Sequence, residues 1–265
     1  MTYAVRSLHT TRAALLNLLL LAVLVPCSLA QSQTPPTTIQ NLYLVRIAHV
    51  RPELAQEYNT FMRDETIPAY KKGGVKLLNT LATSLFGEDL EFISITPAAS
   101  LAQFDEQSPL VKALGLAGQQ AWMAKQRRLT ANYHYYLAQL LPSLCFNLPK
   151  PDAPPPKGYF AVTITTVPGR MQEYESFFKS DLLPALQKAF PRGVLTAKVI
   201  LGGNSGEYRV FMPSDSFAEL ERAIIDAGTA GLFKDSPRTA SLVLRVETAT
   251  YRHVPELSIR PEAQK

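Results

Sequence analysis

Two stretches of this chain repeat each other: residues 56–69 read QEYNTFMRDETIPA, and residues 172–185 read QEYESFFKSDLLPA. The second follows the first at a spacing of 116 residues, and both end in the same Pro-Ala pair. One shared tripeptide arises by chance, but many matches at one offset indicate an internal duplication. The fold is therefore expected to contain two related halves.

Further pairs of similar residues are also 116 residues apart. Near the end of each copy the spacing shortens to 113. The matches include Glu91-Phe92 with Glu207-Tyr208, Pro97 with Pro213, Ser100 and Gln103 with Ser216 and Glu219, and Gly115 with Gly231. Between the copies, the proline-dense stretch PKPDAPPPKG cannot continue a helix or a central strand. We therefore predict repeat 1 over residues 41–146, a linker over 147–158, repeat 2 over 159–258 and a polar tail over 259–265.

Each copy is predicted to follow the order β-α-β-β-α-β. Ser100 with Gln103, and Ser216 with Glu219, have the spacing of a helix-capping box at the same place in both copies. Strands are expected at 42–48, 75–81, 90–96 and 130–137, and again at 159–165, 194–201, 207–212 and 242–250. Helices are expected at 52–66 and 170–189, and from Ser100 and Ser216 onward.

The first strands have one apolar face and one mixed face. If Ile47 is aligned with Ile164, then Tyr43, Val45 and Ile47 share one face of the strand, and the equivalent face of the second copy is also apolar. The other face then carries Arg46 in the first copy and threonines in the second. We expect helices to cover the apolar face and the mixed face to line an interior space.

The first thirty residues are typical of a secretory signal peptide. Arg6 and Arg12 precede an apolar run over residues 13–25, and Ser28-Leu29-Ala30 offers a small-residue cleavage site. The run falls short of the roughly 20 residues that a spanning helix needs. The sequence predicts an exported, soluble protein, periplasmic or extracellular, with a flexible leader over residues 31–40; a membrane anchor is the alternative.

Composition excludes several classes of protein. Of the 265 residues, 46% are hydrophobic and 18% are charged, which excludes a disordered chain. The two cysteines exclude a disulfide-stapled mini-protein, and the net charge of +5 is weak and dispersed, which argues against a nucleic-acid partner. No metal-ligand spacing, haem-attachment motif or phosphate-binding loop is present, so no cofactor and no metal are predicted.

The tandem order of elements resembles the dimeric α+β barrel superfamily fused into one chain. The first strand, the helix ending in Pro68-Ala69 or Pro184-Ala185, and the Ser100 or Ser216 helix are similar to its NIPSNAP and EthD-type branches. The resemblance implies an α+β fold of two ferredoxin-like repeats that form a single-chain pseudo-dimeric barrel around a cavity. A tandem whose sheets are exposed or packed otherwise is the alternative.

Polar residues on the mixed faces are the candidate site. His134 is the candidate catalytic base, since imidazole transfers protons near neutral pH. A hydrogen-bonded structural histidine and solvated ion pairs at a strand end are the alternatives, and haem-binding relatives of the superfamily use a single histidine. The candidate ligand-binding residues are Arg46, Asn132, Tyr133, Tyr135, Arg209, Arg245 and Glu247.

The leading hypothesis is an exported protein that binds a small organic ligand between two sheets. A cofactor-independent oxygenase or isomerase with a histidine base is the second. An interaction module without a small ligand is the third. The fusion predicts a monomer, with no stable membrane insertion after signal removal.

Overall fold

The computed structural model describes residues 40–148, 154–232 and 236–261, all within the single unit formed by residues 39–265. The predicted signal peptide, nearly all of the predicted leader and the middle of the predicted linker lie outside the described residues. Within them, no helix combines the length and the apolar composition that crossing a membrane requires.

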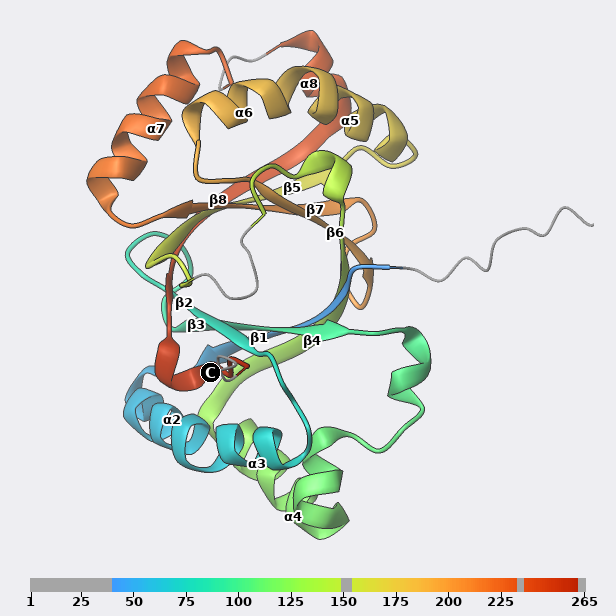
Figure 1. Cartoon of the computed structure of the whole chain (residues 1–265), viewed down its shortest axis with the longest axis vertical. Coiled ribbons are helices and arrows are strands. Elements are labelled where there is room, and N and C mark those ends of the chain that lie inside the picture. The colour runs from blue at the N-terminus through green and yellow to red at the C-terminus, as the bar shows by residue number, and fades with distance from the viewer. Residues whose placement is uncertain (1–39, 149–153, 233–235, 262–265) are drawn as a thin grey trace, which may run out of the picture. The chain divides into compact units, whose positions relative to one another are not determined.

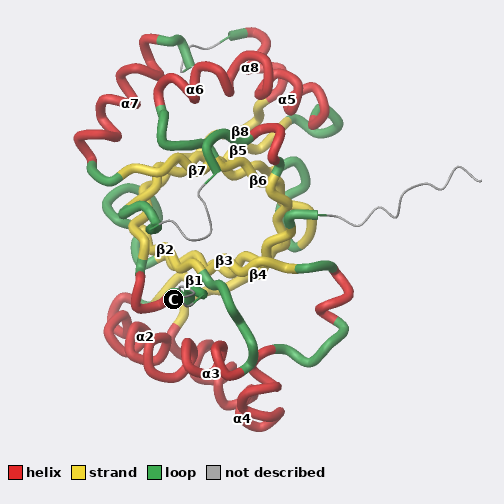
Figure 2. The backbone as a smooth tube through the Cα atoms, viewed as in Figure 1, coloured by secondary structure: helices red, strands yellow, loops and turns green. Residues whose placement is uncertain are grey.

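Eight strands close into one barrel, which Figure 2 shows as a ring of yellow strands. Around the barrel they follow the order β1-β3-β2-β8-β5-β7-β6-β4, and each neighbouring pair is antiparallel. The strands are β1 (Leu42–Val50), β2 (Asn79–Thr83), β3 (Glu91–Ala98), β4 (Thr130–Leu140), β5 (Gly158–Thr166), β6 (Leu195–Leu201), β7 (Glu207–Ser214) and β8 (Val243–His253).

Pairings between the two halves of the chain close the barrel. Leu81, Ala82 and Thr83 of β2 pair with β8, and residues 137–140 of β4 pair with β6. The predicted fold class, two ferredoxin-like repeats in a pseudo-dimer, is therefore wrong, because the strands of both halves form one continuous closed sheet. The backbone groups at the edge of a sheet need partners, and here each half supplies them to the other.

Helices cover the outside of the barrel in two groups (Figure 1). Beneath each group lies a separate apolar cluster, one around Tyr58 and Phe61 and the other around Tyr174 and Phe178. The first half supplies α2 (Ala55–Phe61), α3 (Ile67–Lys72) and α4 (Pro109–Leu129), and the second supplies α5 (Met171–Phe177), α6 (Leu183–Ala189), α7 (Phe217–Thr229) and α8 (Pro237–Leu242).

Both halves interrupt their first long helix at the same place. A π-helical segment, Met62–Thr66 in one half and Phe178–Leu182 in the other, separates the two α-helical parts. Pro68 and Pro184 follow these segments. Because proline has no N–H to donate to the preceding turn, the hydrogen-bond ladder widens there. The Pro-Ala pair repeated in the sequence thus marks a repeated irregularity of the helix.

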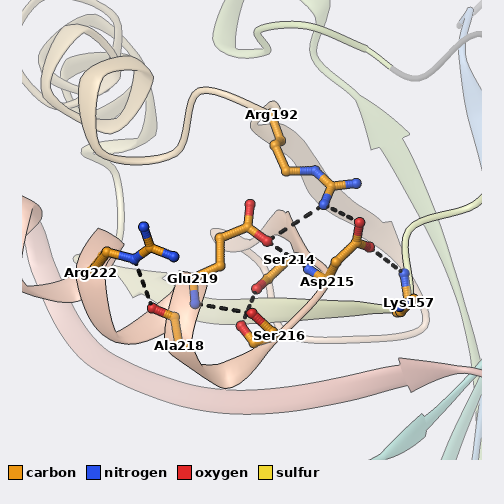
Figure 3. A network of polar contacts seen from close by, with 8 residues as sticks. All are labelled: Lys157, Arg192, Ser214, Asp215, Ser216, Ala218, Glu219 and Arg222. Atoms are coloured by element: carbon orange, nitrogen blue, oxygen red, sulfur yellow. Dashed lines mark hydrogen bonds and ion pairs between the residues drawn. The ribbon is translucent and has the colours of Figure 1, made fainter.

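Ser216 caps α7 as the sequence predicts, whereas Ser100 caps no α-helix. Ser216 Oγ accepts from the Glu219 N–H at 3.1 Å, and the Glu219 carboxylate accepts from the backbone N–H before the cap at 2.8 Å (Figure 3). Ser100 precedes only a short 3-10 turn. Ser108 caps α4 instead, by accepting from the Val111 N–H at 3.3 Å. The two halves therefore begin their second helix differently.

The predicted assignment of the strand faces is inverted in β1, whereas in β5 Phe160 and Ile164 pack beneath the helices as predicted. Val45 and Ile47 belong to the apolar cluster inside the barrel, while the Arg46 side chain contacts α2 and α4 outside it. Since β1 begins at residue 42 and β5 at residue 158, Ile47 corresponds to Thr163 rather than to Ile164. Aligning Ile47 with Ile164 is one residue out of register, and a slip of one residue exchanges the faces of a strand.

Gly202 lies where β6 ends beside β4, and we expect its substitution to destabilise this junction between the two strands. Gly202 has a φ of +79°, and a Cβ there would lie 2.5 Å from the Tyr135 carbonyl oxygen. Gly74 has a φ of +91° with open space around it, so Gly74→Ala is the matched control. Both variants carry a left-handed penalty of ~1–2 kcal/mol, and Gly202→Ala should lose a further ~1–3 kcal/mol from overpacking. Urea denaturation measures the loss of unfolding free energy in each variant, and equal losses would contradict close packing of Gly202 against the Tyr135 carbonyl.

Candidate functional site

The barrel encloses a cavity of about 300 Å³ near the first residues of β1, β2 and β5. Aromatic and aliphatic side chains form most of its wall, including Tyr43, Val45, Ile95, Tyr159 and Phe211. A concave, mostly apolar space with a few polar groups is the usual form of a small-molecule site. This cavity is therefore the candidate functional site.

Besides the tyrosines Tyr43, Tyr136 and Tyr159, three polar side chains interrupt the apolar wall: Asn79, Arg209 and Arg260. Two of their buried atoms, Asn79 Oδ1 and Arg260 Nε, have no hydrogen-bond partner among the described residues. Buried polar atoms are normally paired, so these two are exceptions, and neighbouring atoms cover both of them instead of leaving them open to the cavity.

Arg209 projects from β7 and is held in place by Glu207 and Tyr136. Its Nε donates to Glu207 Oε1 at 2.9 Å, and its guanidinium lies 5.1 Å from the centre of the Tyr136 ring. Burial opposes the charge of Arg209, but the neighbouring Tyr136 and Glu207 outweigh it and raise its pKa. Arg209 is thus a fixed cation in contact with the cavity.

Tyr136 places a second donor beside Arg209. Burial raises the pKa of Tyr136 to about 12, although Arg209 acts in the opposite direction. The phenol therefore stays protonated at neutral pH and can donate its O–H. Together, Arg209 and Tyr136 can hold an oxygen that carries negative charge.

A second polar layer surrounds Glu91. Tyr251 donates to Glu91 Oε1 at 2.6 Å, and His49 Nε2 lies 3.6 Å from Glu91 Oε2. His49 Nδ1 faces Glu88 at 2.9 Å. Among the described residues, His49, Glu88 and Glu91 are the group whose donor atoms lie close enough to suggest a metal site. The two ring nitrogens face different carboxylates, so this geometry bridges the carboxylates instead of directing three donors to one point.

The structure divides the sequence-predicted site residues between two faces of the sheet. Strand alternation places Asn132, His134, Arg209, Arg245 and Glu247 on the inner face and Arg46, Tyr133 and Tyr135 on the outer face. Of these eight, only Arg209 lines the cavity. Arg245 and Glu247 are exposed and form an ion pair with each other at 2.5 Å.

Arg46 is buried on the helix side, at 3% exposure. Its guanidinium donates to Tyr58 Oη at 3.0 Å, to Gln126 Oε1 at 3.3 Å and to Ser94 Oγ at 3.4 Å. No carboxylate among the described residues pairs with it, and its Nε has no partner there. The corresponding residue of the second half is Val162, so this buried charge belongs to the first half alone.

His134 lies beside Tyr136 on the inner face of β4, with the ring centres 6.1 Å apart. It is exposed and does not line the cavity. Its proposed role as a base therefore stays a prediction, and Tyr136 stands between its ring and the apolar wall.

The sequence reasoning missed Tyr43, Asn79, Tyr136, Tyr159 and Arg260. Tyr43 and Tyr159 were recognisable, because they match at the spacing of 116 that the duplication gives. Tyr136 was not among the predicted residues, although its neighbours Tyr133 and Tyr135 were, and only the strand register distinguishes their faces. Asn79 and Arg260 carry no pattern that distinguishes them from other polar residues.

No protein-family profile and no curated protein sequence matches this chain. A candidate monooxygenase from Lactobacillus acidophilus superposes with a TM-score of 0.51 at 8% identity, over 83% of this chain and 95% of that one. An anthrone oxidase-like protein gives 0.52 at 10% identity, over 85% and 96%. A chlorite dismutase variant from Candidatus Nitrospira defluvii gives 0.51 at 8% identity, over 82% and 93%.

At such low identity these likenesses show the fold alone, a closed barrel of strands covered by helices. The NIPSNAP and EthD-type relationship stays a prediction.

The position of His134 predicts its titration. Burial, Arg209 and His49 all disfavour the imidazolium and lower the pKa of His134 below its ordinary value of 6.5. Because the folded-state pKa is lowered, the stabilising contribution is complete above the ordinary pKa and is lost as the pH falls. NMR titration of Arg209→Met should show the His134 pKa moved upward, with Arg46→Met as the control. An unchanged pKa in Arg209→Met would contradict the inner-face placement.

Proposed function

We propose that the barrel binds a small organic molecule with a mainly apolar body and one acidic oxygen group. The observation that carries this proposal is the fixed Arg209 cation, together with the Tyr136 phenol, at an otherwise apolar cavity. Apolar walls favour a flat hydrocarbon portion. A guanidinium donates to a carboxylate or phenolate with a charge-assisted hydrogen bond.

Two further polar side chains of the wall, Asn79 and Arg260, support the same ligand chemistry. The cavity thus favours molecules with polar groups at more than one edge over a purely hydrocarbon ligand.

We propose further that the protein is exported and works outside the cytoplasm. The support is the sequence pattern of the first thirty residues, with basic residues, a short apolar run and a small-residue cleavage site. The Cys145 thiol has a pKa that burial raises, so the described part of the chain offers no reactive thiolate to an oxidising compartment.

A paired ligand comparison tests the binding proposal. 1-Naphthoate and the neutral 1-naphthalenemethanol share an aromatic body, and their fluorescence reports binding. The wild-type protein should bind 1-naphthoate on the order of tenfold more tightly, which is the value of a charge-assisted hydrogen bond. Arg209→Met should abolish this preference, and Arg209→Lys should keep part of it.

Arg46→Met is the matched control, because Arg46 is an even more deeply buried arginine on the opposite face of the sheet. It should leave the preference for 1-naphthoate intact. Equal binding of both compounds by the wild-type protein, or loss of the preference in Arg46→Met but not in Arg209→Met, would overturn the proposal. Circular dichroism confirms that each variant is folded.

A cofactor-independent oxygenase is the second candidate function, and the descriptions of two structural neighbours favour it. In this reaction a base removes an acidic C–H proton and the carbanion reduces O₂. Anthrone tests it, since one anthrone and one O₂ give one anthraquinone and one water. An oxygen electrode should record uptake above autoxidation that falls in His134→Ala. Uptake equal to the protein-free rate would exclude anthrone oxidation and leave the binding function.

A further inference from the structure

One long edge of β8 is free among the described residues. On one side, β8 pairs with β5 from Val243 to Arg252. On the other side it pairs with β2 only at residues 251–253, and the loop after β2 pairs with Thr250. Residues 244–248 therefore form an edge to which no described strand or loop is paired.

The backbone groups of this edge point outward. Thr250 donates its N–H to the Phe86 carbonyl at 2.7 Å and accepts from the Ser84 N–H at 2.8 Å, both on the side away from β5. Backbone direction alternates along a strand, so Thr248 and Val246 turn their N–H and C=O groups to the same side. These groups offer a template for another strand.

One face of the edge carries exposed apolar side chains and the other carries charged ones. Leu244 is 68% exposed and Val246 is 55% exposed, on one face. Arg245 and Glu247 occupy the other face. Natural edges are normally protected by prolines, charged side chains or bulges; here the pairing with β5 shifts register at residues 243–245 and is regular from Arg245 to Arg252.

We propose that two copies of this chain associate through these edges, with their β8 strands antiparallel about a two-fold axis at Val246. In this register Arg245 of each copy lies opposite Glu247 of the other, and the two Val246 residues exchange N–H···O=C bonds. An axis at Arg245 would set arginine against arginine, and an axis at Glu247 would set glutamate against glutamate. Charge complementarity thus selects one register, and a two-fold contact is satisfied on both sides at once.

The first half of the chain provides an internal comparison. Its corresponding strand segment, residues 131–135 of β4, also precedes the pairing with β6. Asn132 and His134 stand there in place of Arg245 and Glu247, so self-pairing gains no complementary charges. Gly202 also lies against the Tyr135 carbonyl, so the turn after β6 covers part of this edge. The proposed contact is therefore specific to β8.

This contact is independent of the cavity and differs from the monomer that the sequence predicts. Fusion of the two halves supplies all strands of the barrel, but it leaves the β8 edge unpaired. A pairing of about five residues per copy is a small contact, so the dimer should dissociate reversibly on dilution.

Sedimentation velocity over a concentration series of the mature protein tests the proposal. The wild-type protein should show a monomer–dimer equilibrium. Arg245→Glu should weaken it on the order of tenfold, because it sets like charges opposite each other. The double variant Arg245→Glu/Glu247→Arg restores the complementary pairs and should restore association.

Val246→Lys should remove the dimer, whereas Leu116→Lys should not. Leu116 is 69% exposed on α4 and serves as the matched apolar control. Circular dichroism and urea denaturation show that each variant is folded, independently of any ligand. A monomer at all concentrations, or a dimer that survives Val246→Lys, would overturn the proposal. A double variant that dimerises no more tightly than Arg245→Glu would overturn it too.

Discussion

Two short stretches of backbone pairing, β2 with β8 and β4 with β6, join the halves of the chain into one closed barrel. Closure gives each strand an inside and an outside, and the alternation of side chains then assigns every residue to one of them. Arg209 faces the cavity and Arg46 faces the helices because of this parity. If β1 slipped by one residue, Arg46 would face the cavity, and if β7 slipped by one residue, Arg209 would face the helices.

The duplication, the order of the elements and the Ser216 cap could be predicted from the sequence, because they depend on local patterns. The continuous sheet that both halves share could not, since hydrogen bonding between distant strands leaves no local pattern; the family resemblance implied a barrel, but one of two separate repeats. The site was predicted only in part, and the reason lies in the first strands. Ile47 and Ile164 look equivalent, yet the helix repeat gives a spacing of 116, which pairs Ile47 with Thr163. Applying that spacing to Tyr43 and Tyr159 would have identified two residues of the cavity wall.

The two halves have diverged in the layers where charge is buried. The first half keeps Arg46 beneath its helices, where the second has Val162, so the fold does not require a cation at this place. The second half supplies Arg209 to the cavity, where the first has Ile93 at the corresponding position. Removing a charge from water is costly. No carboxylate within residues 40–148, 154–232 or 236–261 pairs with Arg46, so its hydrogen bonds to Tyr58 and Gln126 best explain its burial. Arg209 in contrast is paired, and it remains in contact with a space that a ligand can fill.

The central claim is that the inside of the barrel, rather than the layer beneath the helices, receives the ligand. A crystal structure of the mature protein grown with 1-naphthoate tests this claim most directly. The account predicts density for the naphthalene ring between Tyr43, Tyr159 and Phe211, with the carboxylate directed toward Arg209 and Tyr136. Density beside Arg46 beneath α2 and α4, or side chains that fill the barrel and leave no space, would contradict it.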